Sequence, residues 1–361
     1  MDNYIFITGA RGFLGRNLLE VAEKQFPNST FILLVRKKED LKKFNDRFRI
    51  VQGDITLPRL GLNYPDFMAF SNANEVWHLA ASTSFDDKEK DTIYQSNVVG
   101  TKNVLSLSAE LKKLNRFMYV STAYVAGTSA GPISEDSLPE KVGFRNSYEE
   151  TKWESESLVR QSKMPFVIFR PSVIMGNSRT FDPQGERRMF YGYMLGVYYS
   201  ILRECKRLKI DFIKNWNSGE RLKLDVRLLG NVKSTKNFVC IDDVVDTMVC
   251  ILGTTDIMKS YHLTSDSPLD GFVMWRCVEK SLNIDGISYV GETIDNPTRL
   301  EKNIMTYTSP FLPYITYPDP IWLLDNTNRA MGLQKRRQID ETILTGLLKR
   351  FVSQEVDARQ A

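Results

Sequence analysis

The feature that most constrains this sequence is a glycine-rich loop that directly follows its first apolar segment. Residues Tyr4–Thr8 have the composition of a β-strand, and Gly9, Gly12 and Gly15 follow before a helical pattern begins. Gly9 permits a tight turn, Gly12 lets backbone amides approach a pyrophosphate, and Gly15 lets the helix pack closely on the strand. A helix N-terminus in this position attracts phosphate. The strand, loop and helix together predict a dinucleotide-binding site.

Short apolar segments alternate with helical patterns throughout the first half of the chain. This alternation predicts the α/β class, with a doubly wound parallel sheet of the Rossmann type covered by helices on both faces. The predicted strands are Tyr4–Thr8, Phe31–Val35, Arg49–Gln52, Glu75–Leu79, Arg116–Val120 and Phe166–Arg170, and the clearest helices are Leu14–Lys24, Asn97–Lys113 and Tyr148–Ser162.

The pattern changes after residue 176, where a loop-like stretch leads into an aromatic-rich helix over Met189–Leu208. We therefore predict a dinucleotide-binding domain over residues 1–176. Residues 237–264 would complete it, with the strands Asn237–Cys240 and Tyr261–Thr264 returning to the sheet. Residues 177–236 and 265–361 would form a smaller substrate-binding lobe.

The end of the second predicted strand favours NADP(H) over NAD(H). NAD-specific sites place a carboxylate there to bind the ribose 2′-hydroxyl, but this strand is followed by Arg36 and two lysines, with no carboxylate before Glu39. Arg36 can form a planar, charge-assisted contact with a 2′-phosphate, and Arg11 in the glycine loop can reach the same group. After the third strand, Asp54 and Ile55 are suitably placed to bind the adenine ring.

A tyrosine and a lysine four residues apart form the predicted catalytic group. Tyr148 and Lys152 share one face of a helical segment, where the ammonium group would stabilise the phenolate and tune the tyrosine as a proton donor. Thr122 follows the preceding strand, at the edge where doubly wound folds build their sites. Its hydroxyl can donate to the same carbonyl oxygen as Tyr148.

These segments together resemble extended short-chain dehydrogenases, whose glycine spacing is GxxGxxG. The resemblance rests on Gly9–Gly15, His78–Ala81 (HLAA), Asn97–Thr101 (NVVGT), Ser121–Ala123 (STA) and the Tyr148–Lys152 pair. Finer details are similar to the male-sterility and thioester-reductase branch, which includes fatty acyl-CoA reductases and terminal reductase domains: Gly12–Gly15 (GFLG), Lys152–Glu156 (KWESE), Arg170–Thr180 (RPSVIMGNSRT), Phe311–Tyr314 and Asp325–Asn328.

The resemblance implies NADPH-dependent reduction of an acyl thioester to an aldehyde, and in some relatives onward to an alcohol. It also implies that Phe13, Leu14, Ala80 and Pro171 border the cofactor, and that Lys152 contacts the ribose. Because no activating module precedes the fold, the acyl group is expected to arrive on coenzyme A or on an acyl carrier protein. One departure stands out: the glycine usual after the Arg–Thr pair is replaced by Phe181.

Composition excludes several other classes. Four scattered cysteines and two histidines offer no metal-ligand spacing, so no metal site is expected. A net charge of +4 from 48 basic and 44 acidic residues does not argue for nucleic acid, and no apolar run is long enough for a transmembrane helix. We expect a cytoplasmic enzyme with free thiols.

Two other functions remain open. One is an NADP-linked hydroxysteroid or β-hydroxy dehydrogenase, or a sugar-nucleotide epimerase or dehydratase, of the same fold. The other is a non-catalytic NADP-binding regulator. His78 is expected to be structural. The aromatic stretch Met189–Tyr199 could pack the lobe or line an acyl chain, and the basic residues from Arg203 to Arg227 could be solvated or could dock an anionic carrier.

Overall fold

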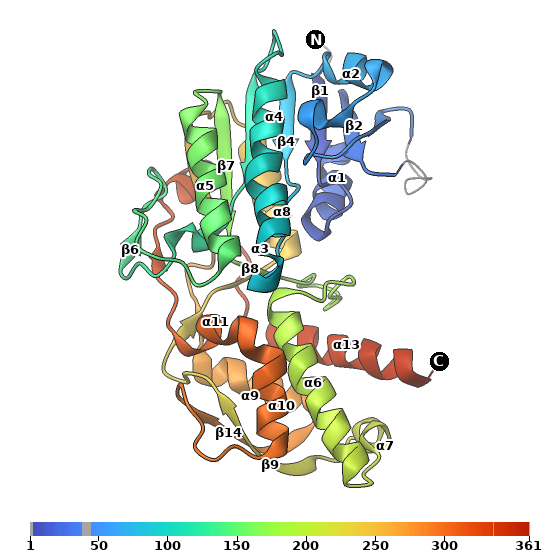
Figure 1. Ribbon diagram of the computed structural model, residues 1–361, viewed down its shortest axis with the longest axis vertical. Helices are drawn as coiled ribbons and strands as arrows, with labels where there is room; N and C mark the ends of the chain where they lie inside the picture. Colours follow the sequence, from blue (N-terminus) through green and yellow to red (C-terminus); the bar gives the residue numbers. More distant parts are fainter. Residues whose placement is uncertain (1–2, 38–44, 335, 361) are drawn as a thin grey trace. The chain divides into compact units, whose positions relative to one another are not determined.

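The computed structural model describes residues 3–37, 45–334 and 336–360, and the chain divides into two compact units (Figure 1). Unit 1 comprises residues 1–172, 243–264 and 320–336. Unit 2 comprises residues 173–242, 265–319 and 337–361.

Unit 1 is built on a seven-stranded parallel sheet, which confirms the predicted fold class. The strand order is β12-β7-β5-β4-β1-β2-β3. Because the order reverses between β1 and β4, this pair forms the topological switch point at which such sheets bind ligands. The strands are β1 (Asn3–Thr8), β2 (Ser29–Val35), β3 (Phe48–Gln52), β4 (Glu75–His78), β5 (Arg116–Val120), β7 (Phe166–Pro171) and β12 (Lys259–Leu263).

Helices cover this sheet, and Figure 1 shows α4 and α5 running side by side along it. Their buried faces contribute to a core with the strands, as in Val104 and Leu107 of α4 and Val159 of α5. The helices of unit 1 are α1 (Phe13–Gln25), α2 (Tyr64–Phe70), α3 (Lys90–Tyr94), α4 (Gly100–Ser108), α5 (Ser147–Gln161), α8 (Ile241–Leu252, from Asp243 onward) and α12 (Asp325–Met331).

Two segments lie elsewhere than the sequence suggested. The strand predicted at Asn237–Cys240 forms as β11 (Phe238–Cys240), but it pairs with β8 (Val173–Met175) in a sheet of its own. The reason is that β7 is already paired on both sides, by β5 and β12. Residues 320–336, expected in the substrate lobe, belong to unit 1, where β15 (Ile321–Trp322) pairs with β6 (Pro132–Ile133).

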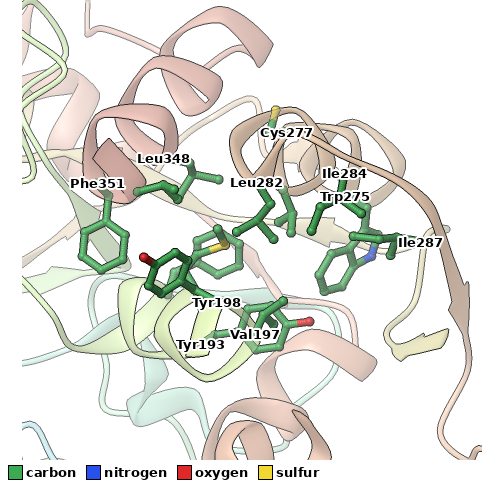
Figure 2. Packing of buried hydrophobic residues seen from close by; sticks show 14 of the residues in the cluster. Tyr193, Val197, Tyr198, Trp275, Cys277, Leu282, Ile284, Ile287, Leu348 and Phe351 are labelled. Atoms are coloured by element: carbon green, nitrogen blue, oxygen red, sulfur yellow. The ribbon is translucent and has the colours of Figure 1, made fainter. Parts of the chain in front are cut away.

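Unit 2 has a separate core centred on α6 (Met189–Arg207). In Figure 2, Tyr193, Val197 and Tyr198 of α6 lie among apolar side chains of other segments, including Trp275 and Leu348. The other elements of unit 2 are α7 (Phe212–Ser218), β9 (Leu222–Leu229), β10 (Thr235–Lys236), β13 (Leu269–Asp270), α9 (Gly271–Leu282), β14 (Ile284–Val290), α10 (Arg299–Thr308), α11 (Leu312–Thr316) and α13 (Glu341–Gln360).

Candidate active site

The glycine loop adopts the geometry that its sequence requires. Gly9 has a φ of +74°, and an added Cβ would come within 2.6 Å of the Ala80 nitrogen. A Cβ on Gly15 would come within 2.2 Å of the Gly9 carbonyl oxygen, because α1 begins at Phe13 and passes directly over the loop. Both positions therefore exclude any side chain.

A cavity of about 430 Å³ opens beside this loop, at the switch point of the sheet. Seven of the residues predicted to bind the cofactor line it: Gly9, Arg11, Gly12, Arg36, Asp54, Ile55 and Ala80. Thr8, Gly53 and Ser96 are further lining residues that the sequence analysis did not assign. Phe13, Leu14, Gly15, Lys152 and Pro171 are not among the residues that line this cavity.

Two arginines and one aspartate are among the charged residues that line this cavity. Arg36 is exposed directly after β2, and Arg11 is exposed in the glycine loop. Asp54 Oδ1 accepts hydrogen bonds from the backbone nitrogen and hydroxyl of Thr56, both at 2.9 Å, and these bonds hold the loop after β3. Glu39, the first carboxylate after β2, lies outside the described residues.

Thr122 lies directly beyond the carboxyl end of β5. Its side chain accepts from the Tyr124 backbone nitrogen at 3.3 Å and so caps the short helical turn Ala123–Ala126. The Thr122 hydroxyl donates to the Pro171 carbonyl, at the end of the adjacent strand β7, across 3.4 Å. That long bond leaves the hydroxyl able to turn toward a better acceptor.

Tyr148 and Lys152 lie on the first two turns of α5. The helix begins here because the Asn146 side chain accepts from the Glu149 backbone nitrogen and caps it. The Tyr148 ring lies 5.4 Å from the ring of Phe85, and the tyrosine is 6% exposed. Lys152 is buried, and its Nζ donates to the Tyr119 hydroxyl at 2.6 Å and to the Val120 carbonyl at 2.7 Å.

The environment of Lys152 changes its acid–base behaviour. Burial lowers the pKa of its ammonium group from 10.5 to about 7, although the nearby Glu156 carboxylate opposes this shift. The lysine can therefore gain and lose a proton near neutral pH. Thr122, Tyr148 and Lys152 thus come from the carboxyl end of β5 and from α5 in the same unit.

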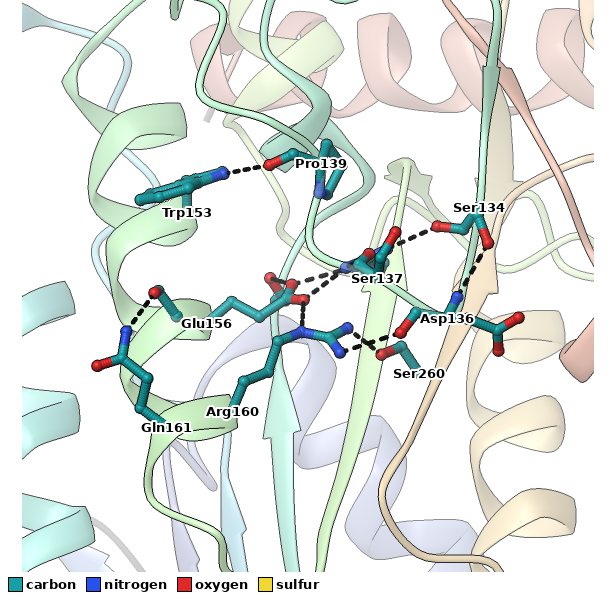
Figure 3. Close-up of polar contacts among 12 residues, drawn as sticks. Ser134, Asp136, Ser137, Pro139, Trp153, Glu156, Arg160, Gln161 and Ser260 are labelled. Carbon is teal, nitrogen blue, oxygen red and sulfur yellow. Dashed lines mark hydrogen bonds and ion pairs between the residues drawn. The ribbon is translucent and has the colours of Figure 1, made fainter.

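A buried ion pair that the sequence analysis did not identify supports this region. Arg170 of β7 and Glu156 of α5 are both fully buried and form a two-point contact at 2.6 and 3.1 Å. Ser121, next to Thr122, donates to the same carboxylate at 2.7 Å. Arg160 donates to Glu156 as well, at 2.9 Å, and it also donates to Ser260 (Figure 3).

The surroundings of Glu156 favour its ionised form. Burial alone would raise the pKa of Glu156, but the charges and hydrogen bonds of Arg170 and Arg160 outweigh it and lower the pKa to about 2. The signal in the sequence was the four-residue spacing from Lys152 to Glu156, with an arginine ending a buried strand. The pairing partner of a buried charge depends on tertiary structure, so spacing alone did not identify it.

A second buried carboxylate fastens residues 320–336 to unit 1. Glu135 accepts from the backbone nitrogens of His262 and Asn326 and from the Thr327 hydroxyl. His262 Nδ1 in turn contacts the Leu323 carbonyl at 2.7 Å. These bonds explain why the C-terminal motif around Asp325–Asn328 packs against the nucleotide-binding unit.

Two sequence features of unit 2 had two interpretations each, the aromatic stretch of α6 and the basic residues that follow it. Most of these aromatic side chains, and several of the basic ones, make contacts within unit 2. Most aromatic side chains of α6 are buried in the core of unit 2, which is the packing interpretation. In the basic run, Arg207, Arg221 and Arg227 form ion pairs with Glu204, Asp285 and Glu301. Arg203 lies over the Tyr307 ring at 5.7 Å. The buried aromatic side chains favour packing, but a cavity of about 900 Å³ in unit 2 is lined by Leu195 and Tyr199 of α6 and by Arg203 and Lys206 of the basic run, so the acyl-lining and carrier-docking interpretations stay predictions.

In the part of the chain that is described, no group of three or more His, Cys, Asp or Glu side chains could hold a metal ion. Within the same residues, no helix combines the length and the apolar character needed to span a bilayer. The four cysteines, Cys205, Cys240, Cys250 and Cys277, are free thiols.

Residues 7–214 of the chain match the family described as male sterility protein. The chain is 36% identical over 182 residues to the hybrid PKS-NRPS synthetase gkaA of Penicillium citrinum, and 30% identical over 228 residues to the fatty acyl-CoA reductase wat of Drosophila melanogaster. The alignments cover 48% and 49% of this chain. They cover only 5% and 44% of the relatives, so this chain corresponds to a part of each.

Solved structures show the same fold along almost the whole chain. The terminal R domain of the myxalamid PKS-NRPS pathway has a TM-score of 0.75 at 21% identity, and covers 98% of this chain and 91% of its own. The UDP-glucuronic acid 4-epimerase of Bacillus cereus, in complex with NAD, has a TM-score of 0.65 at 18% identity, with coverages of 99% and 100%. At these identities both likenesses concern the fold alone.

Proposed function

Because the chain belongs to the male sterility protein family, a nicotinamide-dinucleotide-binding family of the extended short-chain dehydrogenase type, we propose that it reduces an acyl thioester to an aldehyde with NADPH. The observation that carries the proposal is the combination, in one unit, of a cofactor cavity at the switch point and the Thr122, Tyr148 and Lys152 group. The relatives named as a fatty acyl-CoA reductase and as PKS-NRPS synthetases support the thioester as substrate.

NADPH is proposed on the basis of charge. The cavity carries Arg36 after β2 and Arg11 in the loop, where an NAD-selective site would carry a carboxylate. The glycine loop fits a pyrophosphate because Arg11 and Gly12, which line the cavity, directly precede the N-terminus of α1 at Phe13. When bound, the cofactor supplies the hydride to the thioester carbonyl carbon.

In the proposed reaction, residues of this chain would stabilise the negative charge on the carbonyl oxygen and supply the proton that this oxygen takes up. The Thr122 hydroxyl and the Tyr148 phenol would donate hydrogen bonds to the carbonyl oxygen, and these bonds strengthen as negative charge builds on it. Tyr148 would transfer its proton to that oxygen, and Lys152 would stabilise the phenolate that results. The hemithioacetal then collapses to aldehyde and free thiol, because a thiolate is a good leaving group. Further reduction of the aldehyde would give an alcohol.

The acyl group is proposed to arrive as a thioester of coenzyme A or of an acyl carrier protein. Free thiols and a pyridine-nucleotide reductant suit the reducing cytoplasm, where we place the reaction. The proposed reaction involves no nucleic acid.

The test is to measure NADPH consumption, thiol release and carbonyl product with a panel of acyl-CoA, carrier-bound and short synthetic thioesters. We expect one thiol released for each aldehyde formed, and oxidation of NADPH in step with it. A protein that releases no thiol from the panel, but oxidises a β-hydroxy substrate or epimerises a sugar nucleotide, would instead carry out one of the alternative reactions of this fold.

A further inference from the structure

The cavity of about 900 Å³ in unit 2 offers a ligand site that the proposed reaction does not use. It is lined by residues of α6, of α7 and the loop before it, of α10 and of α13, all of which belong to unit 2. Figure 1 shows α6, α7 and α10 as neighbours in this unit. Thr122, Tyr148 and Lys152 are not among the lining residues. Small-molecule sites of proteins have this size, with mostly apolar walls and a few polar groups that orient the ligand.

One wall of the cavity is a continuous face of α6. The lining residues of this helix recur at helical spacing from Gly192 to Lys206, so they share one face. At a rise of about 1.5 Å per residue, this face is about 21 Å long. Gly192 and Gly196 lie on it, where an added Cβ would come within 2.6 Å of the Phe311 ring and within 2.9 Å of the Thr308 side chain. Both glycines line the cavity without filling it, so its long shape suits an extended alkyl chain.

Apolar side chains from three helices form much of the wall. Leu195 and Leu202 of α6 and Ile213 of α7 pack against the core of unit 2, but they are only half-buried. Tyr307 of α10, which also lines the cavity, is 47% exposed. Covering this remaining apolar surface with a hydrocarbon chain is favourable in proportion to the area that is removed from water.

Three basic side chains, Arg203, Lys206 and Arg359, add positive charge to this apolar wall. The Arg203 guanidinium lies over the Tyr307 ring at 5.7 Å, and the Arg359 guanidinium lies over the Tyr199 ring at 5.0 Å. A ring contact uses the face of a guanidinium and leaves its in-plane N–H donors to an anion. Aromatic rings of the wall therefore hold two of the three cations at the cavity.

Carboxylates of the chain do not neutralise this positive charge. In the described part of the chain, the three basic side chains form no ion pair, although the neighbouring Arg207 pairs with Glu204. Asp211 also lines the cavity, and its side chain accepts from the Lys214 backbone nitrogen and caps α7. Three positive charges and one negative charge produce a site that attracts an anionic group.

We propose that this cavity binds a long-chain fatty acid anion, with its carboxylate at Arg203 and Lys206 and its alkyl chain along α6 toward Leu195. A guanidinium offers a carboxylate two parallel hydrogen bonds, and the ammonium group adds a point charge. A singly charged carboxylate fits better than a doubly charged phosphate, because Asp211 at the same cavity repels additional negative charge. Binding here involves neither the cofactor nor the catalytic group, so the proposal does not rest on the proposed function.

Calorimetric titration of the chain with tetradecanoate, below its micelle concentration and without NADPH, tests for the site. We expect saturable binding. Each fully buried methylene strengthens binding by about fourfold, so decanoate, with four fewer methylenes, should bind at least about tenfold more weakly. Tetradecyltrimethylammonium, whose head group is a cation, should not compete, and tetradecyl phosphate should bind more weakly than tetradecanoate. Absence of tetradecanoate binding, equal binding of the ammonium compound, or tighter binding of the phosphate each overturns the proposal.

Charge reversal locates the head group of the fatty acid. Lys206→Glu and Arg203→Glu should each weaken tetradecanoate binding by about tenfold or more, because a charge-assisted contact becomes a repulsion. Lys214→Glu is the matched control, since Lys214 is exposed on α7 and is not a lining residue. It should change the affinity by less than about twofold, because salt screens a charge outside the site. Equal effects of Lys206→Glu and Lys214→Glu, or unchanged affinity in both lining variants, would refute the proposed head-group site.

Filling the cavity locates the alkyl chain. Ile213→Trp occupies part of the space and should weaken tetradecanoate binding by about tenfold, since several methylenes lose their burial. Leu208→Trp is the matched control, because Leu208 is 43% exposed and is not a lining residue, and its affinity should equal that of the parent. Circular dichroism and urea unfolding establish that each variant is folded. A folded Ile213→Trp protein that binds tetradecanoate as tightly as the parent overturns the placement of the chain along α6.

Discussion

Lys152 is expected to destabilise the folded protein, and Lys152→Met should therefore unfold less readily than the parent chain at acidic pH. The buried ammonium group has a pKa of about 7 in the folded state, compared with 10.5 when solvated. Between these values the unfolded chain binds more protons than the folded one, so stability rises with pH across this window. Methionine fills similar space without a charge to desolvate.

The expected magnitude follows from the two pKa values. At pH 6 the linkage relation gives a folding cost of about 5 kcal/mol for the lysine, and at pH 9 a cost of about 2 kcal/mol. The variant also loses the hydrogen bonds to Tyr119 and Val120, which offsets the gain by about 1–3 kcal/mol at every pH. The stability difference between Lys152→Met and the parent should therefore decrease by about 2–3 kcal/mol from pH 6 to pH 9.

Urea unfolding of both proteins, without cofactor, at intervals from pH 6 to pH 9 measures this difference. Lys102→Met is the control, because Lys102 is exposed on α4 and its substitution should give a difference that does not change with pH. Catalytic activity of Lys152→Met should be lost under all conditions. A difference from the parent that stays constant across the pH range would show that the ammonium group is not desolvated in the fold, and would refute the reasoning.

Three further predictions concern the site. Arg36→Asp should weaken NADPH binding by about 2–4 kcal/mol, since a charge-assisted contact becomes a repulsion, while NADH binding changes far less; equal losses in titrations with both cofactors would contradict the 2′-phosphate assignment. Tyr148→Phe should bind NADPH normally but lose turnover by about two to four powers of ten, and full activity would exclude the tyrosine as proton donor. Glu156, with a pKa of about 2 against 4.5, should contribute about 3 kcal/mol of stability above pH 4.5 that is lost as the pH falls toward 2. Acid unfolding of Glu156→Gln should lack this part of the pH dependence.

The parts of the structure that could be predicted from sequence are those determined by local geometry. The positions of Gly9 and Gly15 allow no side chain for steric reasons that involve few neighbouring residues, so their spacing predicted the loop and the helix that follows. The four-residue separation of Tyr148 and Lys152 depends only on helix geometry. Alternation of apolar strands with helices was likewise sufficient for the parallel sheet of unit 1.

The parts that sequence did not predict depend on contacts between distant segments. The strand β11 has ordinary strand composition, and only the pairing of β7 on both of its edges assigns it to β8. Arg170 and Glu156 belong to different elements, and nothing in either segment specifies the other as its partner. Similarly, the hydroxyl that binds Lys152 belongs to Tyr119, which in sequence is indistinguishable from an ordinary aromatic residue of a buried strand.

The departure at Phe181 illustrates how a distant contact can compensate for an unfavourable local residue. Where the resembling sequences have glycine, Phe181 adopts a φ of +55°, a conformation that costs a bulky residue about 1 kcal/mol or more. Its ring packs on Gly346 of α13, where an added Cβ would come within 2.8 Å of the ring. The absence of a side chain at position 346 therefore makes room for the phenylalanine, and the two residues should be energetically coupled.

A double-mutant cycle tests that coupling. In a Phe181→Gly background the space beside α13 is open, so Gly346→Ala should stabilise the helix by about 1 kcal/mol through its higher helix propensity. In the parent chain the same substitution forces the Phe181 ring to move, so it should destabilise by about 1–2 kcal/mol. Urea unfolding of the four proteins should thus show Gly346→Ala changing sign with the residue at position 181. Additive effects would mean that the ring is held by other contacts and that Gly346 is not the reason this chain accommodates phenylalanine in a left-handed conformation.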